Sequence, residues 1–119
     1  MTDQLKKYNL EALRDLSAGD DAFYHDMIRT FLRTTKQTLD AMHMASGEQQ
    51  WLRVRDLAHK MRGPCTHLAA TGLSPLLEQI ENDITDHGRT EHIPQLVQQA
   101  MEEGTVLLNQ LSTDTGLQA

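Results

Sequence analysis

The stretch that decides the fold is W-L-R-V-R-D-L-A-H-K-M-R-G-P-C-T-H-L-A-A, residues 51–70. Its apolar residues recur every three or four positions, which is typical of the buried side of an α-helix. At about 100° per residue these positions cluster around Met61, and His59 lies about 160° away from them. We therefore expect a helix from about Gln50 to Ala70 that turns His59 toward solvent and buries Val54, Leu57, Ala58, Met61, Cys65 and Leu68.

A short helix and a long helix are predicted before this stretch. Three leucines at helical spacing, within residues 10–16, indicate a short helix that Gly19 ends. Asp20 or Asp21 is suited to cap a second helix, which should end near Ser46. The side of this second helix predicted to face the core carries Phe23, Met27, Phe31, Thr35, Leu39 and Met42.

Two more helices are predicted after it. Gly72 ends the third helix, and Ser74 followed by Pro75 is the cap and first-position pair of a helix start. That fourth helix should end at Gly88, and a fifth should begin within residues 90–94. Predicted inward residues are Leu76, Leu77, Ile80 and Ile84 on the fourth helix, and Ile93, Val97, Ala100, Gly104, Leu107 and Leu111 on the fifth. The expected fold is all-α, an antiparallel up-down four-helix bundle with a short additional N-terminal helix.

Length and composition restrict the class of protein. With 119 residues the chain should form one domain, residues 1–119, with loose tails at 1–7 and 113–119. The single cysteine, Cys65, cannot pair within the chain and suits a reducing compartment. A net charge of -6 argues against a nucleic-acid surface, and no apolar run is long enough for membrane insertion. We expect a monomer in the cytoplasm.

The stretch A-H-K-M-R-G-P, residues 58–64, carries the candidate chemistry. Arg62 and Gly63 follow His59 by three and four positions, so the three residues share one side of the helix. A neutral imidazole keeps a lone pair and can attack phosphorus without a separate base. Gly63 leaves the ring uncrowded, and Lys60 and Arg62 can offset the charge of a phosphoryl group. This pattern indicates a phosphoryl carrier rather than an ordinary surface histidine.

These residues resemble the histidine phosphotransfer (Hpt) domains of two-component phosphorelays, whose helix carries H-x-[LIM]-[KR]-G. Residues 59–63 match that pattern in order, and residues 51–58 and 77–81 are also similar to the family. The resemblance implies a phosphorelay intermediate that carries a phosphoryl group on His59 between receiver-domain aspartates. It implies a phosphocarrier without a cofactor of its own, because the receiver domain of a response regulator or hybrid histidine kinase brings Mg²⁺ and most catalytic groups.

The resemblance also suggests supporting residues. Glu81 stands where the family often has a Gln or Glu that hydrogen-bonds the imidazole, although a solvated glutamate would fit the helix pattern equally well. The exposed face around His59 is the candidate docking surface, and it carries Leu52, Arg55, Asp56 and Thr66.

Two residues depart from the family pattern. Pro64 has no amide hydrogen for the carbonyl of Lys60, so we expect a kink just past His59. Many family members have a second glycine ten residues after the histidine, where this chain has Ala69. We expect close helix packing there to accommodate the extra methyl group.

A metal site and a protein adaptor are the alternatives to phosphotransfer. The six histidines include no pair three or four positions apart within one predicted helix, so we expect no metal site. A protein of another class would also fit the exposed face, namely a non-phosphorylated adaptor that binds a partner through Leu52, Asp56 and Gly63. Phosphoryl transfer distinguishes the adaptor from the carrier.

Overall fold

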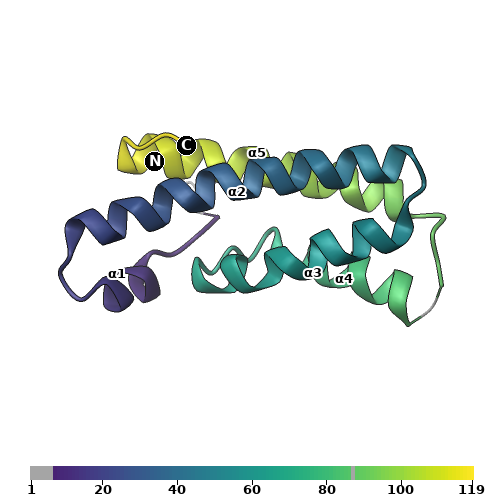
Figure 1. Ribbon diagram of the computed structural model, residues 1–119, viewed down its shortest axis with the longest axis horizontal. Coiled ribbons are helices and arrows are strands. Elements are labelled where there is room, and N and C mark those ends of the chain that lie inside the picture. The colour runs from purple at the N-terminus through teal and green to yellow at the C-terminus, as the bar shows by residue number, and fades with distance from the viewer. Residues whose placement is uncertain (1–6, 87) are drawn as a thin grey trace, which may run out of the picture.

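The computed structural model describes residues 7–86 and 88–119, which form five helices and no strand. The helices are α1 (Glu11–Ser17), α2 (Asp21–Gly47), α3 (Trp51–His67), α4 (Ser74–Thr85) and α5 (Ile93–Thr115). Consecutive long helices run in opposite directions, and α3 and α4 lie below α2 and α5 (Figure 1). The short helix α1 packs against α2. The prediction of an all-α four-helix bundle with an extra N-terminal helix is confirmed. None of the described helices combines the length and apolar character needed to cross a membrane.

Local signals explain most of the helix boundaries. The side chain of Asp20 caps α2 by accepting a hydrogen bond of 3.0 Å from the backbone N–H of Phe23. Before it, Ala18 and Gly19 both have positive φ, which ends α1. One prediction was wrong: Ser74 is the first residue of α4 and not a side-chain cap. The preceding turn is instead closed by backbone hydrogen bonds, with the N–H groups of residues 73 and 74 both bonded to the carbonyl of residue 70.

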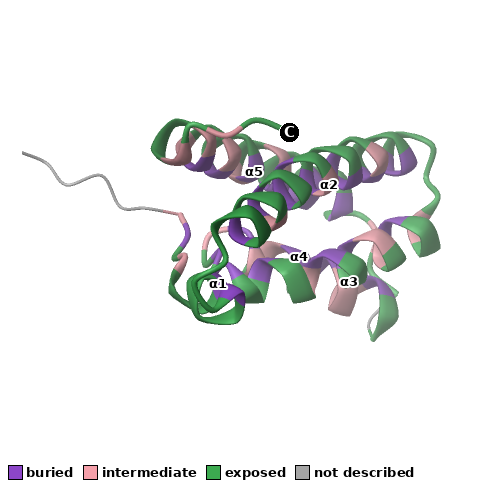
Figure 2. Cartoon of the chain, turned by 60° about the vertical axis from the view of Figure 1, so that its left-hand side comes forward, coloured by how far each residue is buried: buried purple, intermediate pink, exposed green. Residues whose placement is uncertain are grey.

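The core lies on the inward sides of all four long helices (Figure 2). Gly104 lets α2 and α5 approach closely, since a Cβ there would lie 2.3 Å from a methyl carbon of Leu39. Cys65 is fully buried, and burial raises the pKa of its thiol to about 12. Most predicted inward residues are buried, but Phe23 is exposed. Three further residues are only half-buried: Met27, Leu57 and Leu76.

The segments outside the bundle are held by specific contacts. The helix α5 continues to Thr115, beyond the point where we expected a loose tail, and Leu117 packs against the core. On the N-terminal side, the backbone N–H of Lys7 donates to Gln110, and the Tyr8 hydroxyl donates to Asp114. The expectation of a loose tail at residues 1–6 lies outside the described residues.

The ends of α2 and α3 share one backbone motif. After α3, the N–H of Ala69 bonds to the carbonyl of Thr66 and the N–H of Ala70 bonds to that of Cys65, while Ala69 adopts a φ of 49°. The same pattern follows α2, where Gln49 has a φ of 58°. Ala69 is exposed, so the expectation of tight helix packing at this residue was wrong. A glycine would suit the position because of its backbone conformation.

Candidate functional site

The imidazole of His59 projects from α3 into solvent, and its side chain is 71% exposed. Two buried neighbours, Ala58 and Met61, fix the rotation of α3 by facing the core. The helix does not end at Pro64 but continues through it to His67. The position predicted for His59 from the helical periodicity is therefore the one that the structure has.

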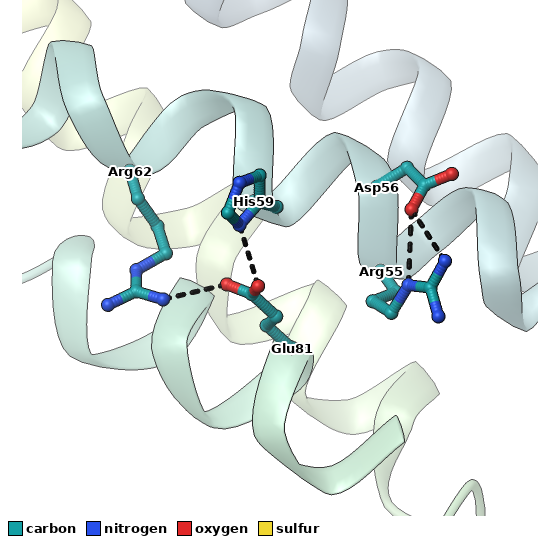
Figure 3. Close-up of polar contacts among 5 residues, drawn as sticks. All are labelled: Arg55, Asp56, His59, Arg62 and Glu81. Atoms are coloured by element: carbon teal, nitrogen blue, oxygen red, sulfur yellow. Dashed lines mark hydrogen bonds and ion pairs between the residues drawn. The ribbon is translucent and has the colours of Figure 1, made fainter. Parts of the chain in front are cut away.

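Glu81 of α4 connects His59 to Arg62. Its Oε2 lies 2.7 Å from Nδ1 of His59, and its Oε1 accepts a hydrogen bond of 2.8 Å from Nη1 of Arg62 (Figure 3). The Glu81 side chain is only 17% exposed, because α3 and α4 pack closely at this point. One carboxylate thus uses both oxygens to hold two side chains of the neighbouring helix.

The electrostatics of this trio favour an ionised Glu81. Burial raises the pKa of its carboxyl group, but hydrogen bonds from Arg62 and His59 outweigh burial, and the pKa lies below its usual range. The same hydrogen bond to Glu81 raises the pKa of the Arg62 guanidinium. Because an ionised carboxylate can only accept hydrogen bonds, Nδ1 of His59 is the donor. In the neutral ring, the lone pair then resides on Nε2.

The space around the imidazole is open at Gly63. A Cβ at this position would have no neighbouring atom within 4 Å. Thr66, one turn further on, is exposed, and its hydroxyl donates to the backbone carbonyl of Arg62 rather than pointing to a partner. An incoming group can therefore reach His59 over this part of α3 without displacing another side chain.

The predicted supporting cations lie apart from each other. Arg62 lies on the α4 side of His59, where it pairs with Glu81 (Figure 3). Lys60 lies on the α2 side, where it lines a groove and has no ion-pair partner among the described residues. Neither cation contacts His59.

The predicted docking residues form an exposed strip along α3. Leu52 is two turns before His59 and is 63% exposed. Between them, Nη2 of Arg55 donates a hydrogen bond of 2.9 Å to Oδ1 of its neighbour Asp56 (Figure 3). This pair leaves the strip close to neutral beside the imidazole.

A groove between α2 and α3 was not predicted. Its volume is about 500 Å³, and it lies on the side of α3 away from Glu81. Lys60, Pro64 and His67 form its α3 edge, and Leu16 and Phe23 line it where α1 meets α2. The signal that was missed is the apolar character of these last two residues, of which Phe23 had been placed on the core-facing side of its helix. We call this the α2–α3 groove; its remaining lining residues are Leu13, Asp26, Met27, Thr30, Phe31, Thr34, Thr35, Thr38, Met61 and Leu68.

The described residues offer no cluster of three or more His, Cys, Asp or Glu side chains that could hold a metal ion. Two carboxylates of α3 and α4, Asp56 and Glu81, are each paired with an arginine.

Comparisons with known proteins agree with this architecture. The family model of the Hpt domain matches residues 26–114. A search of curated proteins finds no match. Among solved structures, the crystal structure of histidine-containing phosphotransfer protein B (HptB) from Pseudomonas aeruginosa PAO1 is similar, with a TM-score of 0.81 and 18% identity over 93% of this chain and 96% of that one. At that identity the likeness establishes the fold, whereas the family model establishes the family. Hpt domains interact with receiver domains in phosphorelays. The chain belongs to the Hpt domain family, and it is a phosphotransfer protein of two-component phosphorelays, a phosphocarrier rather than an enzyme.

Proposed function

We propose that His59 is the phosphoryl acceptor and donor of this protein, and that Nε2 is the reacting atom. The observation that carries the proposal is the 2.7 Å contact between Nδ1 and an ionised Glu81. This contact keeps the proton on Nδ1 and leaves the lone pair of the neutral ring on Nε2. High exposure of His59 and the open space at Gly63 support access by a second protein.

The transfer step needs no proton acceptor on this chain. The Nε2 lone pair attacks the phosphorus of a receiver aspartyl phosphate, a bond from Nε2 to phosphorus forms, and the bond from phosphorus to the aspartate oxygen breaks. The electron pair of the broken bond leaves with the aspartate carboxylate. Transfer to the next receiver is the reverse of this step. The receiver supplies the Mg²⁺ that neutralises the phosphoryl oxygens, because this chain offers the nucleophile but no acidic metal pocket among its described residues.

We propose that the receiver, part of a response regulator or hybrid histidine kinase in the cytoplasm, docks over α3. The strip of Leu52, Arg55, Asp56 and Thr66 flanks His59 on this surface. The α2–α3 groove extends the same surface on the other side of Lys60 and adds apolar area to that of Leu52.

The experiment that tests the carrier function uses a receiver domain bearing a radiolabelled aspartyl phosphate. We expect label on the wild-type protein and none on His59→Gln. His43→Gln is the matched control, because His43 is an exposed histidine on α2 that lies outside the α2–α3 groove, and it should accept label normally. Label that reaches His59→Gln equally, or never reaches the wild type, would contradict the proposal. Receiver binding without any transfer would favour the adaptor function.

Access to Nε2 can be tested separately at Gly63. Gly63→Gln places a long side chain beside the imidazole and should slow transfer about tenfold or more, since small misplacements of reacting groups are costly. Gly63→Ala adds a single carbon in open space and should keep most of the rate. Circular dichroism should show that both variants are folded. An unchanged rate in Gly63→Gln would argue against approach over this part of α3.

A further inference from the structure

Arg62 is bonded to Glu81 and lies on the Nδ1 side of the imidazole, whereas the phosphoryl group would be on Nε2, at the opposite edge of the ring (Figure 3). Its Nη1 donates a charge-assisted hydrogen bond of 2.8 Å to Glu81, which holds the guanidinium on that side of the ring. The carboxylate of Glu81 and the guanidinium of Arg62 are thus placed beside Nδ1, whereas the proposed reacting atom is Nε2. This arrangement needs an explanation beyond the supply of a cation.

The chemistry of phosphoryl loss gives a reason to control Nδ1. When the bond between phosphorus and Nε2 breaks, its electron pair stays on Nε2. If Nδ1 carries a proton, the departing ring is neutral imidazole, which is a good leaving group. If Nδ1 has lost its proton, the departing ring is an imidazolate anion, which is a poor one. The proton on Nδ1 therefore decides how readily phospho-His59 gives up its phosphoryl group.

We propose that Glu81, positioned by Arg62, holds the proton on Nδ1 of His59 in the phosphorylated state, and so keeps the phosphoryl group ready for transfer. This inference depends on the proposed carrier role of His59. Glu81 is a positioning residue that stabilises the protonated phosphoimidazole through its negative charge. Arg62 acts through Glu81 and not on the phosphoryl group.

The surrounding charges leave Glu81 as the group in contact with Nδ1. On α3, Arg55 and Asp56 are bonded to each other, and Lys60 faces the α2–α3 groove. On α4, Glu78 acts on Arg62 and raises its pKa further. Within the described part of the chain, the helix α2 makes no hydrogen bond or ion pair with the imidazole.

Glu81→Gln tests the effect of the charge. Glutamine keeps the length and the acceptor oxygen, but it cannot stabilise a positive ring. The phosphorylated protein, prepared with a labelled receiver and freed of it, is followed for loss of label between about pH 6 and 10. Loss should slow as the pH rises and Nδ1 deprotonates, and in Glu81→Gln this slowing should begin about 0.5–1 pH unit lower than in wild type. ¹⁵N NMR of the phosphorylated ring should report the same shift of the Nδ1 titration. Coincident pH profiles would overturn the proposal.

A double-mutant cycle tests whether Arg62 acts through Glu81. Arg62→Met should change the rate of label loss, or of transfer to a receiver, several-fold in the wild-type background. In a Glu81→Ala background, where no carboxylate remains to be positioned, the same substitution should change either rate less than twofold. Lys60→Met is the control, because its effect should be the same in both backgrounds. An Arg62 effect that persists in full without Glu81 would indicate a direct contact with the phosphoryl group and would overturn the proposal.

Failure of this inference is distinguishable from failure of the carrier function. If His59 is not the carrier, wild type takes up no label that His59→Gln lacks, and no profile can be recorded. If only the inference is wrong, wild type is labelled on His59, and the profiles of wild type and Glu81→Gln coincide.

Discussion

The two sides of α3 are built in opposite ways. Toward α4, polar groups are already paired: Glu81 binds both His59 and Arg62 before any partner arrives. Toward α2, the α2–α3 groove leaves apolar side chains uncovered, and Lys60 has no ion-pair partner among the described residues. The side toward α4 therefore has its polar groups satisfied within the fold, whereas the side toward α2 leaves apolar surface uncovered.

Helix packing explains the contrast. The helices α3 and α4 pack closely, so a side chain of moderate length bridges them. The α2–α3 groove opens where α1 meets α2, and there Phe23 is 45% and Leu16 is 59% exposed. Apolar groups in such a place gain little from folding and would gain more from burial in a complex.

The largest expected effect on stability is at Pro64, on the α2 side of α3. Pro64→Ala restores an N–H inside the helix and should raise the free energy of unfolding by up to about 3 kcal/mol. Pro75→Ala is the matched control, because Pro75 lies in the first turn of α4, where a proline costs little, and stability should barely change. Urea unfolding of both variants measures the difference. Equal effects at the two prolines would mean that the interior of α3 carries no special cost at Pro64.

The next largest effect concerns receiver binding through the groove. Phe23→Asp should raise the Kd for the receiver about tenfold, because an apolar contact is replaced by a charge. The fold should persist, since Phe23 is partly exposed. Met44→Asp also removes an exposed apolar side chain from α2, but outside the groove, and it should leave the Kd unchanged. Titration calorimetry with an unphosphorylated receiver provides the measurement. If both variants bind as wild type does, the α2 side plays no part in docking.

Much of the structure on which this contrast depends could be predicted from the sequence. Helical periodicity predicted the five helices, most of the core and the outward direction of His59, since each depends on local spacing alone. A cap at Asp20 or Asp21 was predicted for the same reason, and Asp20 is the cap. The resemblance to the Hpt family drew attention to Glu81, but not to its second bond with Arg62. That bond depends on the rotation of α4 against α3, which spacing within one helix does not determine.

The α2–α3 groove could not be predicted from the sequence for a related reason. Phe23 follows the apolar pattern of its own helix, so it was placed on the core-facing side of that helix, but it is exposed. Whether a patterned residue is buried depends on whether another helix covers it, and the short helix α1 leaves Phe23 of α2 uncovered. Ala69 was misread similarly: the family's glycine is explained by a left-handed backbone at the end of α3, a feature that the residue type alone does not reveal.

A smaller effect on stability is expected at the C-terminal end of α3, which belongs to neither of its two sides. Ala69→Gly relieves a residue held at a φ of 49° and should stabilise the protein by up to about 1 kcal/mol. Gln49→Gly, at the matching position after α2, should act in the same direction. Ala41→Gly, in the middle of α2, should instead destabilise by about 1 kcal/mol. Thermal unfolding compares the three. Destabilisation by Ala69→Gly would show that its methyl group makes contacts worth more than the strain.

The smallest effect concerns the pH dependence of stability on the α4 side. The pKa of Glu81 is depressed in the folded protein, so its contribution to stability is present above the pKa of an unfolded glutamate and is lost as the pH falls through the lower, folded value. Glu81→Gln should therefore lower the Tm by about 1–2 °C at neutral pH, and the two curves should converge in acid. Because the partners are partly exposed, high salt should reduce the difference. A difference that persists unchanged in acid would mean that Glu81 stabilises the interface of α3 and α4 by packing rather than by charge, and the two sides of α3 would then differ less than their polar contacts suggest.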